Sequence, residues 1–183
     1  FKKNKEYWKP ELSSERENLP KIKIIFKKKE NFLPGKKINE VEKNFSDWPR
    51  SHGGFSSMRF SSLEQINKNN VKNLKLAWIY NSKDGRKGIE SNPVVYKGLV
   101  YMPTPGNYII CLDGTNGKEI WRYKVEKGYH AAKRGLLVWE DKESNIIKLF
   151  FTNDDQLISL NAITGEPIKS FGINGIIKIG SSP

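Results

Sequence analysis

Three side chains with ligand-binding chemistry stand beside short apolar runs in the middle of the chain. Arg134 precedes the apolar residues 136–139, and a planar guanidinium can hold a carboxylate through two parallel hydrogen bonds. His130 stands four residues before Arg134, and because imidazole titrates near pH 6.5 it could donate to a ligand or respond to pH. Glu90 supplies a carboxylate ahead of the apolar residues 93–96. A surface arginine, an ordinary loop histidine and a turn-exposed glutamate are the alternative interpretations.

The number of cysteines limits the kinds of site that the chain can form. Cys111 is the single cysteine among 183 residues, which excludes an intrachain disulfide and a cysteine metal cluster. We expect a buried, unreactive thiol, since free cysteine is among the residues most often found inside proteins. No apolar run approaches the roughly 20 residues that a membrane-spanning helix needs.

Charge is concentrated at the start of the chain. The formal net charge is +12, and residues 1–43 hold thirteen basic and seven acidic side chains. Pro10, Pro20 and the Pro34-Gly35 turn signal interrupt this part, and its one short apolar stretch is residues 22–26. No nucleic-acid motif accompanies the lysines, so we predict that residues 1–44 form an extension, either a solvated arm or a tether facing a membrane surface, and that nucleic acid is not a partner.

Short β-type runs separated by Gly, Asn or Asp follow Ser46, a pattern typical of an all-β meander. The sequence is compatible with a helix only at residues 62–67, where a serine precedes a short apolar-periodic turn. The expected strands are residues 76–80, 93–96, 99–102, 108–112, 120–123, 136–139, 146–151, 157–160 and 168–171.

An internal repeat organises these strands. Residues 108–123 align with residues 156–171 at an offset of 48, and residues 99–104 align with 147–152 at the same offset. Four short strands every 40 to 50 residues are typical of a β-propeller blade. Each copy encodes a turn between its third and fourth strands, Asp113 to Gly117 and Asn161 to Gly165, where glycine can take a positive φ.

The tryptophan after the first turn is expected to seal the repeat. Trp121 has the flat area to cover the gap between adjacent blades, whereas Lys169 stands at the matching place in the second copy. Two or three blades cannot close a ring, because each needs neighbours on both faces. We therefore predict an all-β chain whose residues 45–183 are the first blades of a propeller that is incomplete at its C-terminal end.

Several motifs in a fixed order resemble the opening of PQQ-dependent quinoprotein dehydrogenases. The resemblance rests on the following residues, with Ser62 in place of the family's usual proline: Asp47-Trp-Pro49, Gly53-Gly54, Arg59-Phe-Ser-Ser-Leu63, Gln65-Ile-Asn67, Asn70-Val71, Asn73-Leu74, Ala77-Trp78, Glu90-Ser-Asn-Pro93, Gly98-Leu-Val-Tyr101 and Leu112-Asp113…Gly117-Lys118…Trp121. Two later stretches, His130-Ala-Ala-Lys-Arg-Gly135 and Phe171-Gly172…Gly175, are most similar to the membrane-bound glucose dehydrogenase branch.

The resemblance implies an eight-bladed propeller that holds pyrroloquinoline quinone (PQQ), with Ca²⁺ in many members. It implies oxidation of a sugar or an alcohol, transfer of electrons to a quinone acceptor, and a periplasmic location with a possible association with the inner membrane. The quinone supplies the redox chemistry, while protein groups orient it and tune it. The family's catalytic aspartate and Ca²⁺ ligands fall in later blades, beyond this chain.

Three residues are assigned to the cofactor by this resemblance. Arg134 matches an arginine that holds a PQQ carboxylate, Glu90 matches an acidic residue beside that pair, and His130 matches a histidine near the quinone. Ala131-Ala132 stands where methanol-type enzymes carry two adjacent cysteines, so a methanol-type enzyme is disfavoured. The alternative hypothesis is a non-catalytic propeller of the same superfamily that acts as a binding or assembly scaffold.

Overall fold

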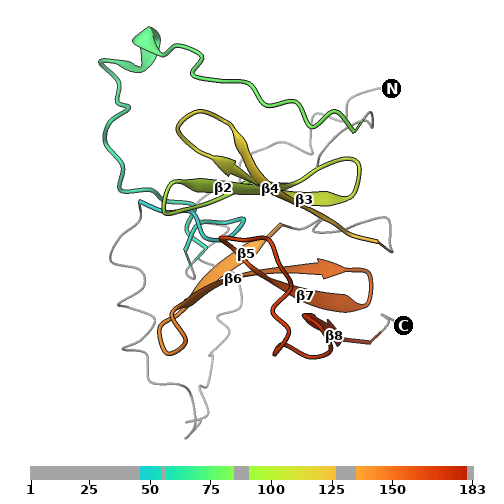
Figure 1. Cartoon of the computed structure of the whole chain (residues 1–183). Helices are drawn as coiled ribbons and strands as arrows, with labels where there is room; N and C mark the ends of the chain where they lie inside the picture. Colours follow the sequence, from blue (N-terminus) through green and yellow to red (C-terminus); the bar gives the residue numbers. More distant parts are fainter. Residues whose placement is uncertain (1–45, 55–56, 85–90, 127–134, 181–183) are drawn as a thin grey trace, which may run out of the picture. The chain divides into compact units, whose positions relative to one another are not determined.

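A computed structural model describes residues 46–54, 57–84, 91–126 and 135–180, all of them within the unit Lys36–Pro183. They form two four-stranded antiparallel sheets, each with its strands in chain order (Figure 1). The first sheet contains β1 (Val94–Tyr96), β2 (Leu99–Pro103), β3 (Tyr108–Asp113) and β4 (Glu119–Lys124), and the second contains β5 (Leu137–Asp141), β6 (Ile146–Asn153), β7 (Gln156–Asn161) and β8 (Ile176–Lys178). The prediction of an all-β chain with four-stranded antiparallel blades is confirmed. Eight blades, truncation, and a domain boundary between residues 44 and 45 stay predictions.

The two predicted turns have the expected chemistry. Gly117 has φ +72° and Gly165 has φ +76°, in the left-handed region that other residues enter at a cost. In the first turn the Asp113 carboxylate accepts the Thr115 N–H at 2.8 Å, and in the second the Asn161 amide oxygen accepts the Ile163 N–H at 2.9 Å. The repeat therefore specifies both third-to-fourth-strand connections.

The fourth strand of the second sheet differs from the prediction. Residues 168–171 were expected to form it, but only the Leu160–Pro167 bridge and the Ile168 N–H bond to Ser159 (3.0 Å) start the pairing there. The chain then leaves the sheet through residues 169–175, and β8 completes the ladder against β7. Gly172 (φ +58°) and Gly175 (φ +88°) make this excursion possible, so the expected strand at 168–171 is wrong and β8 takes its place.

Residues 62–67, the one place where the sequence is compatible with a helix, do not form one. The helical turn of the described residues is a 3₁₀ segment at Val71–Asn73, and residues 62–67 are irregular. Leu63 and Ile66 are 52% and 60% exposed, so no packing offsets the cost of nucleating so short a helix.

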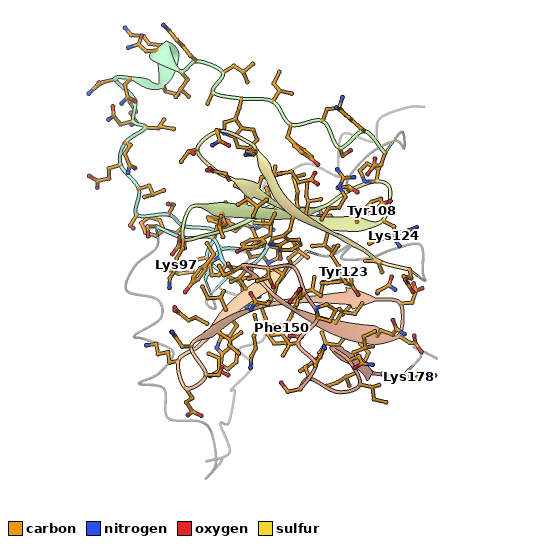
Figure 2. All side chains as sticks on the ribbon, in the orientation of Figure 1. Lys97, Tyr108, Tyr123, Lys124, Phe150 and Lys178 are labelled. Carbon is orange, nitrogen blue, oxygen red and sulfur yellow. The ribbon has the colours of Figure 1, made fainter. Side chains whose placement is uncertain are left out.

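Both sheets contribute to one hydrophobic core. Tyr101, Ile109 and Cys111 of the first sheet cluster with Val138, Leu149 and other buried residues of the second. Tyr123 on β4, labelled in Figure 2, meets Phe151 on β6 edge-on, with ring centroids 6.3 Å apart. Cys111 is fully buried, as predicted, and burial raises the pKa of its thiol to about 12. Among the described residues, no helix is long and apolar enough to span a membrane.

Candidate functional site

The first strands of the two sheets are joined by the segment 48–50. Trp48 pairs with Val95 of β1 through two backbone hydrogen bonds of 2.7 and 2.9 Å. The Pro49 carbonyl accepts the Val138 N–H of β5 at 2.8 Å, and Arg50 forms a bridge with Leu137. One short segment thus fixes β1 and β5, the first strand of each sheet, relative to each other.

A tight turn follows this segment and meets the chain just ahead of each first strand. The Gly53 N–H bonds to the Arg50 carbonyl at 3.0 Å, and Gly53 (φ +87°) lies against the Trp48 ring. Asn92, shortly before β1, donates its side-chain amide to the Ser51 carbonyl at 3.3 Å. Gly135 (φ +111°), shortly before β5, lies so close to Ser51 that a Cβ there would meet the serine Cβ at 3.0 Å. We call this place, Arg50–Gly53 with Ser91, Asn92 and Gly135, the first-strand corner.

The three predicted cofactor residues, Glu90, His130 and Arg134, lie outside the described residues, and their roles stay predictions. Their chain neighbours are informative, because Ser91 follows Glu90 and Gly135 follows Arg134. Asn92 and Gly135 both meet Ser51, so the chain next to residue 90 and the chain next to residue 134 approach the same turn. The structure therefore brings Asn92 and Gly135 to one turn, although 43 positions separate them.

A buried hydroxyl at the first-strand corner was missed at the sequence level. The Ser91 Oγ is inaccessible and has no hydrogen-bond partner in the part of the chain that the structure describes. A buried hydroxyl without a partner is costly, so it calls for a ligand, water or another segment. The motif Glu90-Ser-Asn-Pro93 includes this serine, but residue types alone do not distinguish a buried serine from one that is exposed in a turn.

Cationic side chains gather on the same turn. Arg59 lies 3.1 Å from the His52 Nε2 and donates its backbone N–H to the His52 carbonyl, while the Arg50 guanidinium donates to the Ser57 hydroxyl at 3.1 Å. Ser57 (φ +57°) and Arg59 (φ +53°) both adopt a left-handed backbone that side chains make unfavourable. The guanidinium groups of Arg50 and Arg59 are suited to an anionic ligand.

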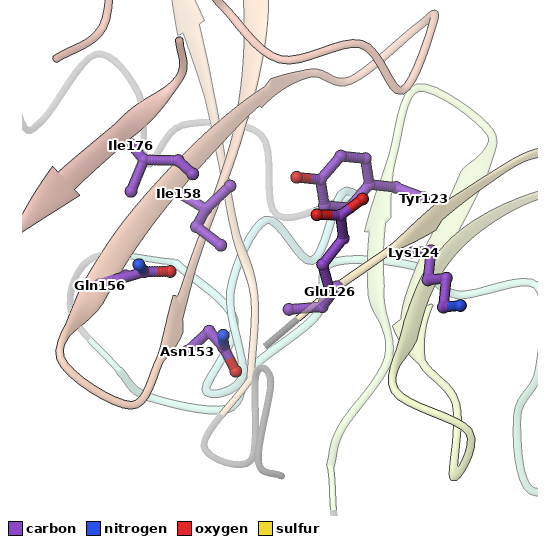
Figure 3. A pocket seen from close by; sticks show the side chains of 8 residues that line it. Tyr123, Lys124, Glu126, Asn153, Gln156, Ile158 and Ile176 are labelled. Atoms are coloured by element: carbon purple, nitrogen blue, oxygen red, sulfur yellow. The ribbon is translucent and has the colours of Figure 1, made fainter. Parts of the chain in front are cut away.

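A hollow of about 210 Å³ lies elsewhere, between the end of β4 and the second sheet (Figure 3). Tyr123 and Glu126 face it from one side, and Asn153, Gln156 and Ile158 face it from the other. It shares no residue with the first-strand corner, and the chain leaves the described residues directly after Glu126. Across the described ranges, no group of three or more His, Cys, Asp or Glu side chains could hold a metal ion.

Comparison with known proteins identifies the family. Residues 48–182 match the family model described as PQQ, glucose/ethanol/alcohol dehydrogenase, β-propeller domain. The chain is 32% identical over 160 residues to quinohemoprotein alcohol dehydrogenase ADH IIB of Pseudomonas putida (78% of this chain, 22% of the relative). It is 29% identical over 158 residues to quinoprotein glucose dehydrogenase of Escherichia coli strain K12 (74% and 20%).

Solved structures agree with the sequence relatives. The quinohemoprotein alcohol dehydrogenase ADHIIG of Pseudomonas putida superposes with a TM-score of 0.59 at 29% identity, covering 73% of this chain and 20% of that one. A europium-containing methanol dehydrogenase superposes with a TM-score of 0.56 at 26% identity, covering 71% and 23%. The chain spans about one fifth of the length of these relatives. The repeat, the two sheets and these matches together show that the chain belongs to the family of PQQ-dependent glucose and alcohol dehydrogenases with a β-propeller domain.

Proposed function

We propose that this chain is part of a dehydrogenase that uses PQQ to oxidise an alcohol or a sugar and passes the electrons to a quinone acceptor. The observation that carries the proposal is the first-strand corner, where the chain beside Glu90 and the chain beside Arg134 meet one turn next to a buried, unsatisfied serine hydroxyl. PQQ is a planar quinone with three carboxylates, and it supplies the two-electron redox chemistry when bound.

The residues that the family resemblance assigns to the cofactor, and Ser91 at the corner, suit such a ligand. The fork of Arg134 is assigned to one carboxylate, since a guanidinium holds a planar anion through two bonds. Glu90 orients that arginine, and His130 donates to the quinone. The Ser91 hydroxyl lacks a partner among the described residues and has a donor to offer to a carboxylate oxygen.

The metal ion and the cellular location are part of the same proposal. We assign Ca²⁺ to residues beyond this chain, as the family resemblance implies. The protein is placed in the periplasm, with the lysine-rich residues 1–44 near the inner-membrane surface. Fractionation of the source cells tests the location directly: recovery of the protein in the cytosolic fraction would contradict it.

A PQQ titration tests the cofactor assignment. The protein as isolated from its source is stripped of cofactor and titrated with PQQ in the presence of Ca²⁺, with quenching of tryptophan fluorescence as the readout. Loss of a charge-assisted bidentate bond costs about 1.5 to 3 kcal/mol, so Arg134→Ala should weaken binding by about 10-fold to 150-fold. Arg134→Lys should recover part of this loss, and Ser91→Ala should weaken binding by a smaller factor.

The matched control is Lys178→Ala on β8, whose cationic side chain is 77% exposed and far along the chain from the corner. It should bind PQQ as the unmodified protein does. Equal affinity of Arg134→Ala and Lys178→Ala would refute the assignment, and failure of the unmodified protein to bind PQQ would favour the scaffold hypothesis. Dye reduction by glucose and by simple alcohols then identifies the substrate class.

A further inference from the structure

Polar side chains from both sheets converge on the hollow of about 210 Å³ beside the end of β4 (Figure 3). Tyr123 and Glu126 face it from β4 and from the residues that follow this strand, and Gln156 faces it from the start of β7. In the part of the chain that the structure describes, the side chains of these three residues form no hydrogen bond and no ion pair. Their hydrogen-bonding capacity is therefore available to a molecule in the hollow.

Paired backbone holds these groups in place. The Tyr123 ring meets Phe151 of β6 edge-on, which fixes the direction of its hydroxyl. Asn153 and Gln156 lie opposite each other where β6 and β7 join. The Val125 N–H bonds to the chain just ahead of β3 at 3.1 Å, and Glu126 follows directly. The hollow is thus lined by residues of two sheets whose positions are set before any ligand arrives.

The floor of the hollow is apolar, with one buried amide beside it. Val125 and Ile158 are 5% and 2% exposed, and Ile176 of β8 lines the hollow next to them. Asn153 lines it as well and is 3% exposed. An apolar floor with a few converging polar groups is the usual character of a small-molecule site.

The polar groups differ in what they can exchange with a ligand. The Glu126 carboxylate accepts hydrogen bonds, whereas the Asn153 and Gln156 amides donate and accept. Burial, together with the nearby Glu126 carboxylate, raises the pKa of Tyr123, so its hydroxyl keeps its proton at neutral pH and can donate as well as accept. The amino group of Lys124 points away from the Glu126 carboxylate in Figure 3. The hollow therefore offers both kinds of partner and one carboxylate.

This combination selects among ligand classes. An anion would be repelled by Glu126, and an apolar molecule would leave the polar groups unpaired. An ammonium group carries donors only, so it would leave the amide N–H groups of Asn153 and Gln156 unmatched. Neighbouring hydroxyls on a carbon ring donate and accept at once, and the C–H groups of the ring can lie on the apolar floor.

We propose that this hollow binds a small neutral polyol of the size of a monosaccharide, held by Glu126, Tyr123 and Gln156. Its volume is below the roughly 300 to 1,000 Å³ of sites for drug-sized ligands, which limits the occupant to a small molecule. The hollow shares no residue with the first-strand corner, so this inference goes beyond the proposed dehydrogenase function and holds whether or not PQQ binds. The polyol is bound there unchanged, because no redox group is assigned to the hollow.

Amide hydrogen exchange with and without glucose tests the location. The protein as isolated from its source is stripped of PQQ, so that glucose is not oxidised during the measurement. Peptides covering residues 123–126 and 153–158 should exchange at least about three times more slowly in saturating glucose. Cyclohexanol and cyclohexylamine, which offer one hydroxyl and one ammonium group on a similar ring, should not slow exchange in these peptides.

Variants of the lining residues test the assigned contacts, with glucose affinity taken from the same exchange data over a range of concentrations. Glu126→Gln should weaken glucose binding about 10-fold and Tyr123→Phe about threefold, since each variant removes one hydrogen-bonding group and keeps the shape of the side chain. Glu143→Gln is the matched control, an exposed carboxylate in the turn between β5 and β6. Tyr108→Phe is the second control, because the Tyr108 ring lies against Arg122 on β4 instead. Both controls should bind glucose as the unmodified protein does.

The remaining outcomes would overturn the proposal. These are unchanged exchange at residues 123–126 and 153–158, equal glucose affinity of Glu126→Gln and Glu143→Gln, or protection by cyclohexylamine in place of glucose. Slower exchange confined to residues 48–54 and 91–95 would place glucose at the first-strand corner and would overturn it too. A protein that binds PQQ without protection of the hollow by glucose contradicts this inference alone, and the reverse result contradicts the proposed function alone.

Discussion

The contact between a turn glycine and the tryptophan that covers it yields a quantitative test of blade packing. A Cβ added at Gly165 would lie 2.6 Å from the Trp121 ring, well inside contact distance, and φ at Gly165 is +76°. Gly98 has a similar φ of +78°, but a Cβ there would meet nothing within 4 Å. Gly98→Ala should therefore lower the free energy of unfolding by the backbone cost alone, about 1 kcal/mol. Gly165→Ala should lower it by the same backbone cost and by a further overpacking cost of about 1 to 3 kcal/mol.

The cycle with Trp121→Ala separates the two costs. Once the indole is removed, Gly165→Ala should cost no more than Gly98→Ala, so the coupling free energy between positions 121 and 165 should be about 1 to 3 kcal/mol. Urea unfolding followed by far-UV circular dichroism gives the free energies without relying on the deleted fluorophore. Equal costs for Gly165→Ala and Gly98→Ala would refute the reasoning, and so would a cost at Gly165 that survives removal of Trp121.

The equivalent pair in the first sheet, Gly117 and Trp78, allows a comparison with Gly165 and Trp121. A Cβ at Gly117 would lie 2.5 Å from the Trp78 ring, as close as in the other pair. Trp78, however, lies on a segment, residues 76–82, that has no backbone hydrogen bond to other described residues and is held there by side-chain bonds. It can therefore move more easily than Trp121 on β4, so Gly117→Ala should be less destabilising than Gly165→Ala in urea unfolding of the chain of residues 1–183.

Two further predictions concern titratable groups. Hydrogen bonds from Arg122, and a further one from Tyr80, hold the pKa of Glu119 below its usual value despite partial burial. The stability that the ionised Glu119 contributes is present above its unfolded pKa near 4.3 and is lost as the pH falls through its lower folded pKa. Glu119→Gln should therefore lower the free energy of unfolding in urea more at pH 7 than at pH 3. Equal losses at the two pH values would contradict this. Because burial raises the pKa of Cys111 to about 12, its thiol should resist maleimide labelling at pH 8 in the folded chain and react once the chain is unfolded in urea, and rapid labelling of the folded chain would show that the core is open.

Local chemistry explains why much of the fold could be predicted. Asp113 with Gly117 and Asn161 with Gly165 specify their turns within a few residues, and the strands beside them are apolar almost throughout. The cover of the second sheet by Trp121 followed from its place after the turn. These features depend on residues that are close together in the sequence. Because the repeat contains the same pattern twice, each copy supports the prediction made from the other.

Long-range pairing explains what was missed. Residues 76–80 have strand composition, yet a strand exists only where another strand pairs with it, and the described residues offer none. The expected strand at 168–171 is replaced by β8 because the chain leaves the sheet after Ile168 and returns after Gly175. The buried Ser91 hydroxyl could not be recognised either, since its surroundings depend on Trp48 pairing with Val95 across 47 positions.

The same topology accounts for the place of the candidate site. Asp84 is fixed beside the first sheet, where it accepts the Gly106 N–H at 2.9 Å, and the chain reappears at Ser91 ahead of β1. In the next repeat Glu126 follows β4, and the chain reappears at Gly135 ahead of β5. Ser51 therefore contacts the chain ahead of both first strands, through Asn92 before β1 and through Gly135 before β5, although the two strands belong to different repeats. The turn that carries Ser51 is for this reason part of the proposed PQQ site.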